Sequence, residues 1–247
     1  MIPYERHERI LERLGASGLM KIADLQDELP GVSASTLRRD LKELERLGKI
    51  EHLSGGAVKL MATAHEVSIT SKDASHSQEK ETVAQLAADE VADGDVVYVD
   101  SGSTGTALLR RLIDRPVTIY TTNGSACLIR SETRAEVNVV GGVFNPVTSS
   151  LSGAMTLSVL RDLYFDRSFL GINAIDEERG CMTPSFAEAE KKRVIAANSQ
   201  AAYMLCDSSK FHTVSNVRVL GFDGITIVSD ATDEKIARCA RLITPTA

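Results

Sequence analysis

The sequence predicts an α/β protein: a small N-terminal helical domain closed by a β-hairpin, then a larger domain built on a mostly parallel α/β sheet. Apolar residues at helical spacing and a glycine turn occupy residues 1–60, whereas short apolar runs alternate with helical segments over residues 77–247. Between them, residues 61–76 are polar, small and aperiodic, which is typical of a linker. A chain of 247 residues is long enough for two separate cores.

The charge distribution limits how this chain can meet nucleic acid. The net charge is −6, yet residues 1–60 carry ten Lys/Arg and ten Asp/Glu, so the remaining 18 cations and 24 anions supply the whole excess. A protein that coats DNA structurally is excluded, because neither part has the positive charge that non-specific binding needs. Any contact with DNA must depend on a local basic patch.

The cysteines and the apolar runs predict a cytoplasmic protein. The four cysteines are Cys127, Cys181, Cys206 and Cys239, and no two of them form a C-x-x-C pair. This spacing suits neither a zinc finger nor a dense disulfide framework, so reduced, mostly buried thiols are expected. We expect no metal and no cofactor. No run approaches the roughly 18 apolar residues of a membrane span, so no membrane partner is expected.

Three helices are predicted before residue 48. Apolar spacing over Tyr4–Leu14 predicts the first, which stops at Gly15. The run Met20–Leu29 predicts a second, which ends at Pro30-Gly31 because proline disfavours a helical residue before it. The third begins three residues later, at Ser33, so that a short helix, a tight turn and another helix follow one another as in a helix-turn-helix.

In the third predicted helix, residues 33–47, apolar and cationic residues lie on opposite faces. At about 100° per residue, Leu37, Leu41 and Leu44 form one apolar stripe with Leu47 at its edge. The opposite face is cationic and polar, and the carboxylates of Asp40, Glu43 and Glu45 are left on the flanks. The alternative is a solvated helix whose cations pair with neighbouring carboxylates.

A glycine turn follows this helix. Two short extended runs, Lys49–Leu53 and Ala57–Leu60, flank Ser54-Gly55-Gly56 and predict a hairpin wing. The alternative is a hairpin that only closes the core. With Ser33 as helix cap and the next two hydroxyls in the first turn, the predicted DNA-contact residues are Ser33, Ser35, Thr36, Arg38, Arg39, Lys42, Arg46, Gly55 and Gly56.

The second domain begins with a predicted helix over Gln78–Ala92 and then alternates between strands and helices. This alternation predicts a largely parallel sheet. The predicted strands are Val96–Val99, Val117–Tyr120, Val137–Val140, Ser168–Gly171, Ala202–Cys206 and Ile225–Val228.

Polar residues follow these strands. The loop Asp100–Thr106 is rich in glycine and hydroxyls and leads into a helix predicted from Ala107, an arrangement that presents N–H groups to an anion such as phosphate. The alternative is a capped turn that binds nothing. The loop lacks the lysine of a Walker A motif and the glycine spacing of a Rossmann fingerprint.

Ligands of open α/β sheets bind beyond the carboxyl ends of the strands, where these turns meet. We therefore predict a site for a small polyhydroxylated anion, with Lys192 and Lys210 as phosphate or hydroxyl partners. The alternative for Glu188–Arg193 is an exposed helix face of ion pairs. The predicted ligand residues are Asp100, Ser101, Gly102, Ser103, Thr104, Thr122, Asn123, Gly141, Gly142, Gly171, Glu190, Lys192, Asp207 and Lys210.

These segments resemble the DeoR family of bacterial transcriptional regulators over nearly the whole chain. The resemblance is carried by the segments Ser33–Leu41, Ser54–Ala57, Asp100–Thr104, Thr122-Asn123, Gly141-Gly142, Glu188–Arg193 and Asp207–Lys210. It implies a winged helix-turn-helix and an effector domain similar in fold to ribose-5-phosphate isomerase that senses phosphorylated sugars. The sequence departs from the family pattern at Ser54, Gly105 and Asn173-Ala174.

The leading hypothesis is a regulator, more often a repressor, of carbohydrate metabolism genes that binds operator DNA under control of a phosphorylated sugar or related metabolite. It is expected to act as a homodimer or homotetramer, because helix-turn-helix proteins pair on repeated half-sites. The rival is a sugar-phosphate isomerase-like enzyme with Glu190 or Asp207 as base and Lys192 or Lys210 as electrophilic partner. The absence of a placeable acid–base pair favours the regulator.

Overall fold

The computed structural model describes residues 2–17, 19–46, 49–53, 55–60, 75–129 and 133–246. The chain forms two compact units, Met1–Val67 and Ser68–Ala247. Most of the predicted linker 61–76, together with Leu47 and Ser54, lies outside the described residues. None of the described helices has the length and apolar character to cross a membrane.

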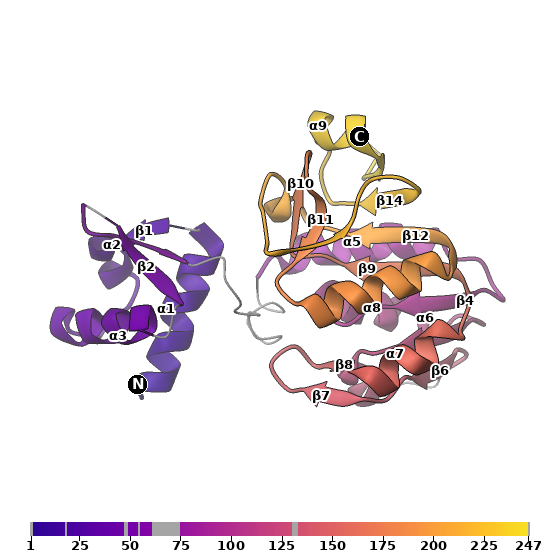
Figure 1. Ribbon diagram of the computed structural model, residues 1–247, viewed down its shortest axis with the longest axis horizontal. Helices are drawn as coiled ribbons and strands as arrows, with labels where there is room; N and C mark the ends of the chain where they lie inside the picture. Colours follow the sequence, from indigo (N-terminus) through magenta and orange to yellow (C-terminus); the bar gives the residue numbers. More distant parts are fainter. Residues whose placement is uncertain are drawn as a thin grey trace. The chain divides into compact units, whose positions relative to one another are not determined.

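The N-terminal unit packs three helices against a three-stranded antiparallel sheet of order β1-β3-β2 (Figure 1). Its core gathers one apolar face from each helix, including Ile10 and Leu14 as well as the predicted stripe Leu37, Leu41 and Leu44, all fully buried. The elements are α1 (Pro3–Ser17), β1 (Leu19–Lys21), α2 (Ile22–Asp27), α3 (Ala34–Arg46), β2 (Ile50–Leu53) and β3 (Ala57–Leu60).

The predicted hairpin is confirmed, but the predicted second helix is wrong over its first residues. Leu19–Lys21 is a strand, and Met20 pairs with Val58 of the hairpin. The helical apolar spacing is overridden there because the backbone gains a strand partner, while the Met20 side chain still packs against the core. The first helix also runs past Gly15 to Ser17.

The larger unit is built on a seven-stranded sheet in which every neighbouring pair is parallel (Figure 1). All six predicted strands lie in it with end shifts of a few residues, and a seventh was missed. In sheet order the strands are β15 (Arg241–Ile243), β14 (Ile225–Val228), β12 (Ser199–Leu205), β9 (Phe165–Gly171), β4 (Val96–Val99), β5 (Thr118–Thr121) and β6 (Glu136–Val139).

Helices cover both faces of this sheet, so successive strand residues are buried on opposite sides. Val97 and Val99 pack in the cluster that contains α5 and α6, whereas Tyr98 packs in the cluster that contains α7, α8 and α9. The helices are α5 (Ser77–Asp89), α6 (Ser103–Leu112), α7 (Ala154–Arg161), α8 (Phe186–Ala197) and α9 (Glu234–Cys239), with short 3-10 turns η1 (Gly124–Leu128) and η2 (Ser208–Lys210).

Two small antiparallel sheets were not predicted. One is a hairpin of β7 (Val143–Asn145) and β8 (Ser150–Ser152), and the other joins β10 (Ala174–Asp176), β11 (Gly180–Thr183) and β13 (Val217–Leu220). All five of these strands are three or four residues long, too short to show periodicity. The hairpin follows β6 directly and so brings residues 149–151 to the carboxyl ends of the parallel strands, as the bridge from Asn123 to Ser150 shows.

Candidate functional site

The start of α3 has the predicted cap. The Thr36 backbone N–H donates to Ser33 Oγ over 3.2 Å, and the same oxygen lies 2.8 Å from Thr36 Oγ1 and 3.0 Å from Ser35 Oγ. This closes the first turn with three neighbouring hydroxyls. Ser33 and Ser35 are exposed, so the helix N-terminus presents hydroxyls and N–H groups to solvent.

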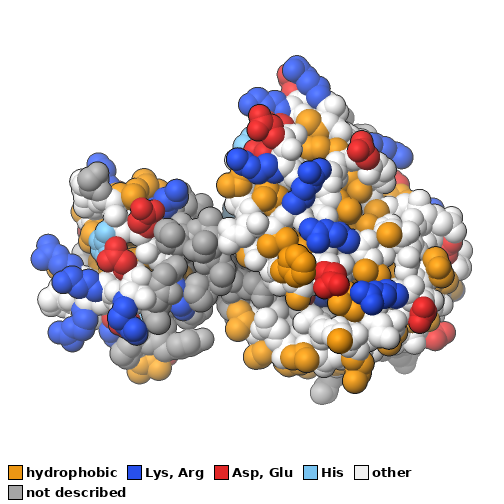
Figure 2. All heavy atoms as spheres, viewed as in Figure 1, with side chains coloured by type: hydrophobic (Ala, Val, Ile, Leu, Met, Phe, Trp, Pro, Cys, Tyr) orange, Lys and Arg blue, Asp and Glu red, His pale blue; other side chains and the backbone are white. Residues whose placement is uncertain are grey.

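The cations of α3 divide into two groups. Arg38, Arg39 and Lys42 are exposed, and none of them has an ion-pair partner within 4 Å among the residues that the structure describes. His52 lowers the pKa of the Glu45 carboxyl by hydrogen bonding, and Lys42 adds only weakly to that effect. Arg46 is instead held by Glu43, with guanidinium-to-carboxylate distances of 2.9 and 2.6 Å. Lys and Arg side chains gather around α3 in the space-filling view (Figure 2). Three of the four predicted cations on this helix are therefore available to an anionic partner.

Asp40 fixes α3 against α1. Its carboxylate is almost fully buried and accepts from Arg6 Nε over 2.6 Å and Arg6 Nη2 over 3.0 Å, with His7 Nε2 at 3.2 Å. Burial opposes ionisation, but the Arg6 guanidinium outweighs it and lowers the pKa of Asp40. Asp40 lies on a flank of the apolar stripe, as predicted, and on that flank it is buried against α1. Its angular position, about 60° from Leu37 and 40° from Leu44, already placed it beside the apolar stripe.

The wing has a tight exposed turn at Gly55 and Gly56, with φ of +96° and +75°. Such angles favour glycine at both positions. His52 in β2 is tied to α3, because its Nδ1 lies 3.0 Å and its backbone N 3.2 Å from Glu45 Oε1. The wing is thus connected to the helix that carries the free cations.

The second site lies at the carboxyl edge of the parallel sheet. Asp100, fully buried just after β4, accepts a hydrogen bond at Oδ2 from Gly171 N–H at the end of β9, over 3.2 Å. Thr122 and Asn123, just after β5, are also fully buried. The structure therefore brings together the predicted residues that follow three adjacent strands.

Helix α8 adds charged side chains to this edge. Ser185 caps it by accepting from the Glu188 N–H over 3.3 Å, and Glu188, Lys191 and Lys192 then share one face at i, i+3 and i+4. Lys192 Nζ lies 2.5 Å from Asp100 Oδ2 and 3.2 Å from Glu188 Oε2. Lys192 is buried, so the alternative of an exposed face of ion pairs is wrong for it.

Sequence reasoning missed Lys191, together with Glu188 and Ser150, as residues of this site. Lys191 Nζ donates to Thr122 Oγ1, Ser150 Oγ and Glu188 Oε1, each over 3.0 Å, and the Lys191 side chain is 1% exposed. Ser150 also donates to Glu188 over 2.9 Å and accepts from Ser101 over 2.9 Å. We call Asp100, Glu188, Lys191, Lys192 and Ser150 the strand-end cluster. The i, i+3, i+4 spacing of its helical members was the available signal.

The strand-end cluster buries two lysines together with two carboxyl groups. Burial raises the pKa of Glu188, but Lys192 and Lys191 outweigh it and lower that pKa to about 2. Burial likewise disfavours the ammonium of Lys192, but the Asp100 and Glu188 carboxylates raise its pKa above the ordinary value. Two lysines and two carboxylates thus balance one another. Fixed ammonium donors and carboxylate acceptors side by side suit a ligand that has both hydroxyls and negative charge.

The loop after β4 leads directly into α6, which starts at Ser103 rather than at the predicted Ala107. Gly102 precedes it with φ of +108°. At Gly105 a Cβ would lie 2.1 Å from the Asp100 carbonyl oxygen, so the helix approaches the strand end more closely than a side chain allows. Ser103 and Thr104 stand in the first turn, where backbone N–H groups have no intrahelical acceptor.

Other predicted residues lie outside the strand-end cluster. Glu190 is 3.7 Å from Arg161 of α7 with its side chain 40% exposed. Asp207 lies after β12, where Lys210 Nζ is 2.9 Å from its Oδ2 and, against the effect of burial, helps to lower its pKa. At Gly142 a Cβ would lie 2.0 Å from Thr156 Oγ1, and the Gly141 carbonyl accepts from that hydroxyl, so this pair serves close packing of α7.

Comparisons with known proteins agree with both units. The DeoR-like helix-turn-helix domain matches residues 6–63, and the DeoR C-terminal sensor domain matches residues 75–231. The HTH-type transcriptional regulator GlpR of Haloferax volcanii is 33% identical over 94% of this chain and 91% of its own. A lactose phosphotransferase system repressor of Streptococcus mutans is 30% identical over 83% of both chains.

Solved structures resemble this chain more distantly. Ribose-5-phosphate isomerase A of Methanocaldococcus jannaschii aligns with a TM-score of 0.41 and 19% identity, and covers 56% of this chain and 55% of its own. The chain thus spans about half the length of that isomerase. An eIF2B delta subunit of Chaetomium thermophilum aligns with a TM-score of 0.46 and 12% identity over 82% of this chain and 66% of its own.

Proposed function

This chain belongs to the DeoR family and is a DNA-binding transcriptional regulator, and we propose that it represses carbohydrate metabolism genes under the control of a phosphorylated sugar or related metabolite. Its relatives include a repressor named for a lactose phosphotransferase system. The observation that carries the proposal is the strand-end cluster, which places buried ammonium and carboxylate groups beside the N-terminus of α6.

A sugar phosphate suits these groups. The loop before α6 offers N–H groups and a positive helix end to the phosphate, and Ser101, Ser103 and Thr104 add hydroxyl donors. Glu188 and Asp100 accept hydrogen bonds from sugar hydroxyls, whereas Lys191 and Lys192 donate to oxygens. The charge-balanced state holds these side chains in place before the ligand enters.

On DNA, α3 is the proposed recognition helix. Arg38, Arg39 and Lys42 supply phosphate and base contacts, and Ser35 and Thr36 lie at the helix start where base edges are read. Three free cations give modest affinity for one copy, so we propose that the protein acts as a homodimer or homotetramer. The effector shifts the population toward the assembly that it binds better, which changes how the paired helices meet the operator.

We also propose that the site senses its ligand without reacting with it. A general acid or base works best with a pKa near the operating pH. In the strand-end cluster the pKa of Glu188 is lowered to about 2 and that of Lys192 is raised, and outside the cluster the pKa of Asp207 is also lowered. These shifts move the pKa values of all three groups further from neutral pH, so none of them is suited to act as the acid or base of an isomerase.

A thermal-shift screen of the full chain against phosphorylated sugars and their unphosphorylated counterparts tests the proposal. A ligand that binds only the native state stabilises it by about 2.7 kcal/mol at one hundred times its dissociation constant. We expect at least one sugar phosphate to raise Tm and its unphosphorylated form to act more weakly.

Lys191→Met should abolish the Tm shift, whereas Lys235→Met, which removes a 70% exposed lysine, should leave it unchanged. A flat response across the panel contradicts the proposed effector class. Conversion of one sugar phosphate into another, followed by NMR, would show that the site is catalytic.

A further inference from the structure

One long segment of the larger unit carries no charge. Residues 137–160 contain no Asp, Glu, Lys, Arg or His, although 25% of the chain is Asp, Glu, Lys or Arg. This segment includes most of the edge strand β6, the β7–β8 hairpin and all of α7 except Arg161. Neither the DNA-contact residues nor the charged members of the strand-end cluster explain why a surface segment should avoid charge.

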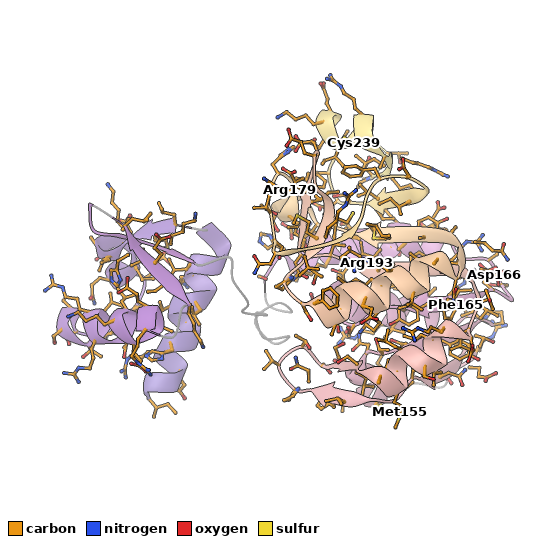
Figure 3. The ribbon with its side chains drawn as sticks, viewed as in Figure 1. Met155, Phe165, Asp166, Arg179, Arg193 and Cys239 are labelled. Atoms are coloured by element: carbon orange, nitrogen blue, oxygen red, sulfur yellow. The ribbon has the colours of Figure 1, made fainter. Side chains whose placement is uncertain are left out.

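The segment also exposes large apolar side chains. Val143 is 71% and Phe144 52% exposed on β7, Val147 is 45% exposed in the hairpin turn, and Met155 is 70% and Val159 44% exposed on α7. We call these five residues the hairpin–α7 face. Met155 and Val159, at i and i+4, share one side of the helix, and Met155 points away from the sheet (Figure 3).

The two halves of the hairpin–α7 face are adjacent. The turn between β8 and α7 is a single residue, Gly153, whose missing Cβ would lie 3.5 Å from Val143 Cγ2. Hydrophobic side chains are visible along this edge of the unit over β7 and α7 (Figure 2). A grouped, exposed apolar surface of this kind marks an interaction site rather than ordinary scatter.

The lack of charge indicates what binds there. Residues 61–247 carry 18 cations and 24 anions, so this part of the chain has a net negative charge that works against pairing with a second copy. In a two-fold interface the same patch meets itself, and any charge near the axis faces its like. An uncharged apolar patch avoids that repulsion, whereas it offers nothing to a charged partner such as DNA or an acidic peptide.

We infer that the hairpin–α7 face is the surface through which two copies of this chain associate. The inference rests on the pairing that the proposed function requires and assigns that pairing to named residues. Charged residues are depleted at the centre of protein interfaces, where Phe and Met are enriched, and this face has that composition.

The inner side of the same hairpin belongs to the strand-end cluster. Ser150 bonds to Ser101, Lys191 and Glu188, and the Leu151 N–H donates to the Thr122 carbonyl over 2.8 Å. The Gly124 N–H donates to the Ser149 carbonyl over 2.7 Å. The same hairpin therefore has the proposed ligand site on one side and the association surface on the other, so ligand binding and pairing affect each other through it.

Sedimentation velocity of the full chain, without DNA or sugar phosphate, tests the inference. Met155→Glu and Val143→Glu each put one carboxylate per copy on the hairpin–α7 face. At position 155 a carboxylate in the first helical turn is compatible with folding. Like charges at an interface cost several kcal/mol, so we expect each variant to raise the dissociation constant of pairing about a hundredfold.

Val214→Glu is the matched control, because Val214 is 47% exposed and lies outside the face. Circular dichroism and Tm establish that every variant is folded. A wild-type chain that is monomeric at all concentrations, or folded variants at positions 143 and 155 that keep the wild-type mass, overturns the inference. A monomer that still binds sugar phosphate overturns the inference and the proposed pairing but leaves the proposed effector standing. A pairing chain that ignores all sugar phosphates contradicts only the proposed effector.

Discussion

Helices α3 and α8 carry similar clusters of lysine, arginine and glutamate, but the structure uses them in opposite ways. On α3, Arg38, Arg39 and Lys42 extend into solvent without ion-pair partners within 4 Å among the described residues. On α8, Lys191 and Lys192 are buried and held by Glu188 and Asp100 at 2.5 to 3.2 Å. Free cations suit a polyanion that approaches from solvent, whereas buried paired ones suit a small ligand that must fit fixed donors and acceptors.

The largest expected difference between the two helices is in stability. Lys192→Met leaves the buried carboxylate of Asp100 without its 2.5 Å partner, and breaking a buried pair in this way costs about 3–5 kcal/mol. Arg39→Ala removes an exposed side chain and should change the free energy of unfolding by no more than about 0.5 kcal/mol. Urea denaturation of both variants measures the difference. Equal unfolding free energies would mean that the strand-end cluster does not stabilise the fold.

DNA binding, in contrast to stability, should be affected more by Arg39→Ala than by Lys192→Met. Arg39→Ala should weaken binding to DNA from upstream of the protein's own gene by about tenfold or more at fixed salt, because a lost base contact costs about 1–3 kcal/mol. Arg46→Ala should have a smaller effect, since Glu43 already holds that guanidinium at 2.6 and 2.9 Å. Lys192→Met should bind as wild type wherever it is folded.

Fluorescence anisotropy at several salt concentrations separates these variants. Loss of a phosphate contact also reduces the slope of log affinity against log salt by about 1. If Arg39→Ala and Arg46→Ala bind equally well, the separation of free from held cations on α3 has no role in DNA recognition.

The same two helices show how far the sequence leads. The apolar stripe of α3 and the strands around β4 are predictable because periodicity and continuous apolar runs report burial. Asp100 and Lys192 are 92 residues apart, and no spacing rule connects them. Both were predicted as site residues from their places after a strand and on a helix, but the ion pair between them depends on how α8 packs across the sheet.

Glu190 and Lys191 show the limit more sharply. They are neighbours in α8, and the predicted Glu190 faces Arg161 at the surface whereas the unpredicted Lys191 is 1% exposed inside the cluster. The sequence motif does not show which side of α8 faces the core. The packing of Ala189 and Ile195 into the core fixes that side. The flank position of Asp40 was predictable, but its burial was not, since its partner Arg6 comes from another helix.

The smallest expected effect is a pH dependence outside both helices. His212 has φ of +55°, its Nδ1 lies 3.1 Å from Glu177 Oε1 and its Nε2 2.9 Å from Asp233 Oδ2, with Lys235 3.6 Å from Glu177. Hydrogen bonds to Asp233 and Glu177 raise the pKa of His212. The protonated imidazole therefore stabilises the folded state through these two carboxylates. This stabilisation is complete below the ordinary histidine pKa of about 6.5 and is lost as pH rises through the higher pKa of the folded state.

His212→Asn tests this without straining the backbone, because asparagine tolerates positive φ. The ion pairs of His212 with Glu177 and Asp233 are partly exposed to solvent, so their contribution is small. The Tm of wild type should exceed that of the variant by no more than about 2 °C at low pH, and the two Tm values should become equal at alkaline pH. A Tm difference that is constant from acid to alkaline pH would mean that the imidazole acts by packing rather than by charge. Since α3 and α8 contain no part of this site, DNA and sugar-phosphate binding should be the same in both proteins.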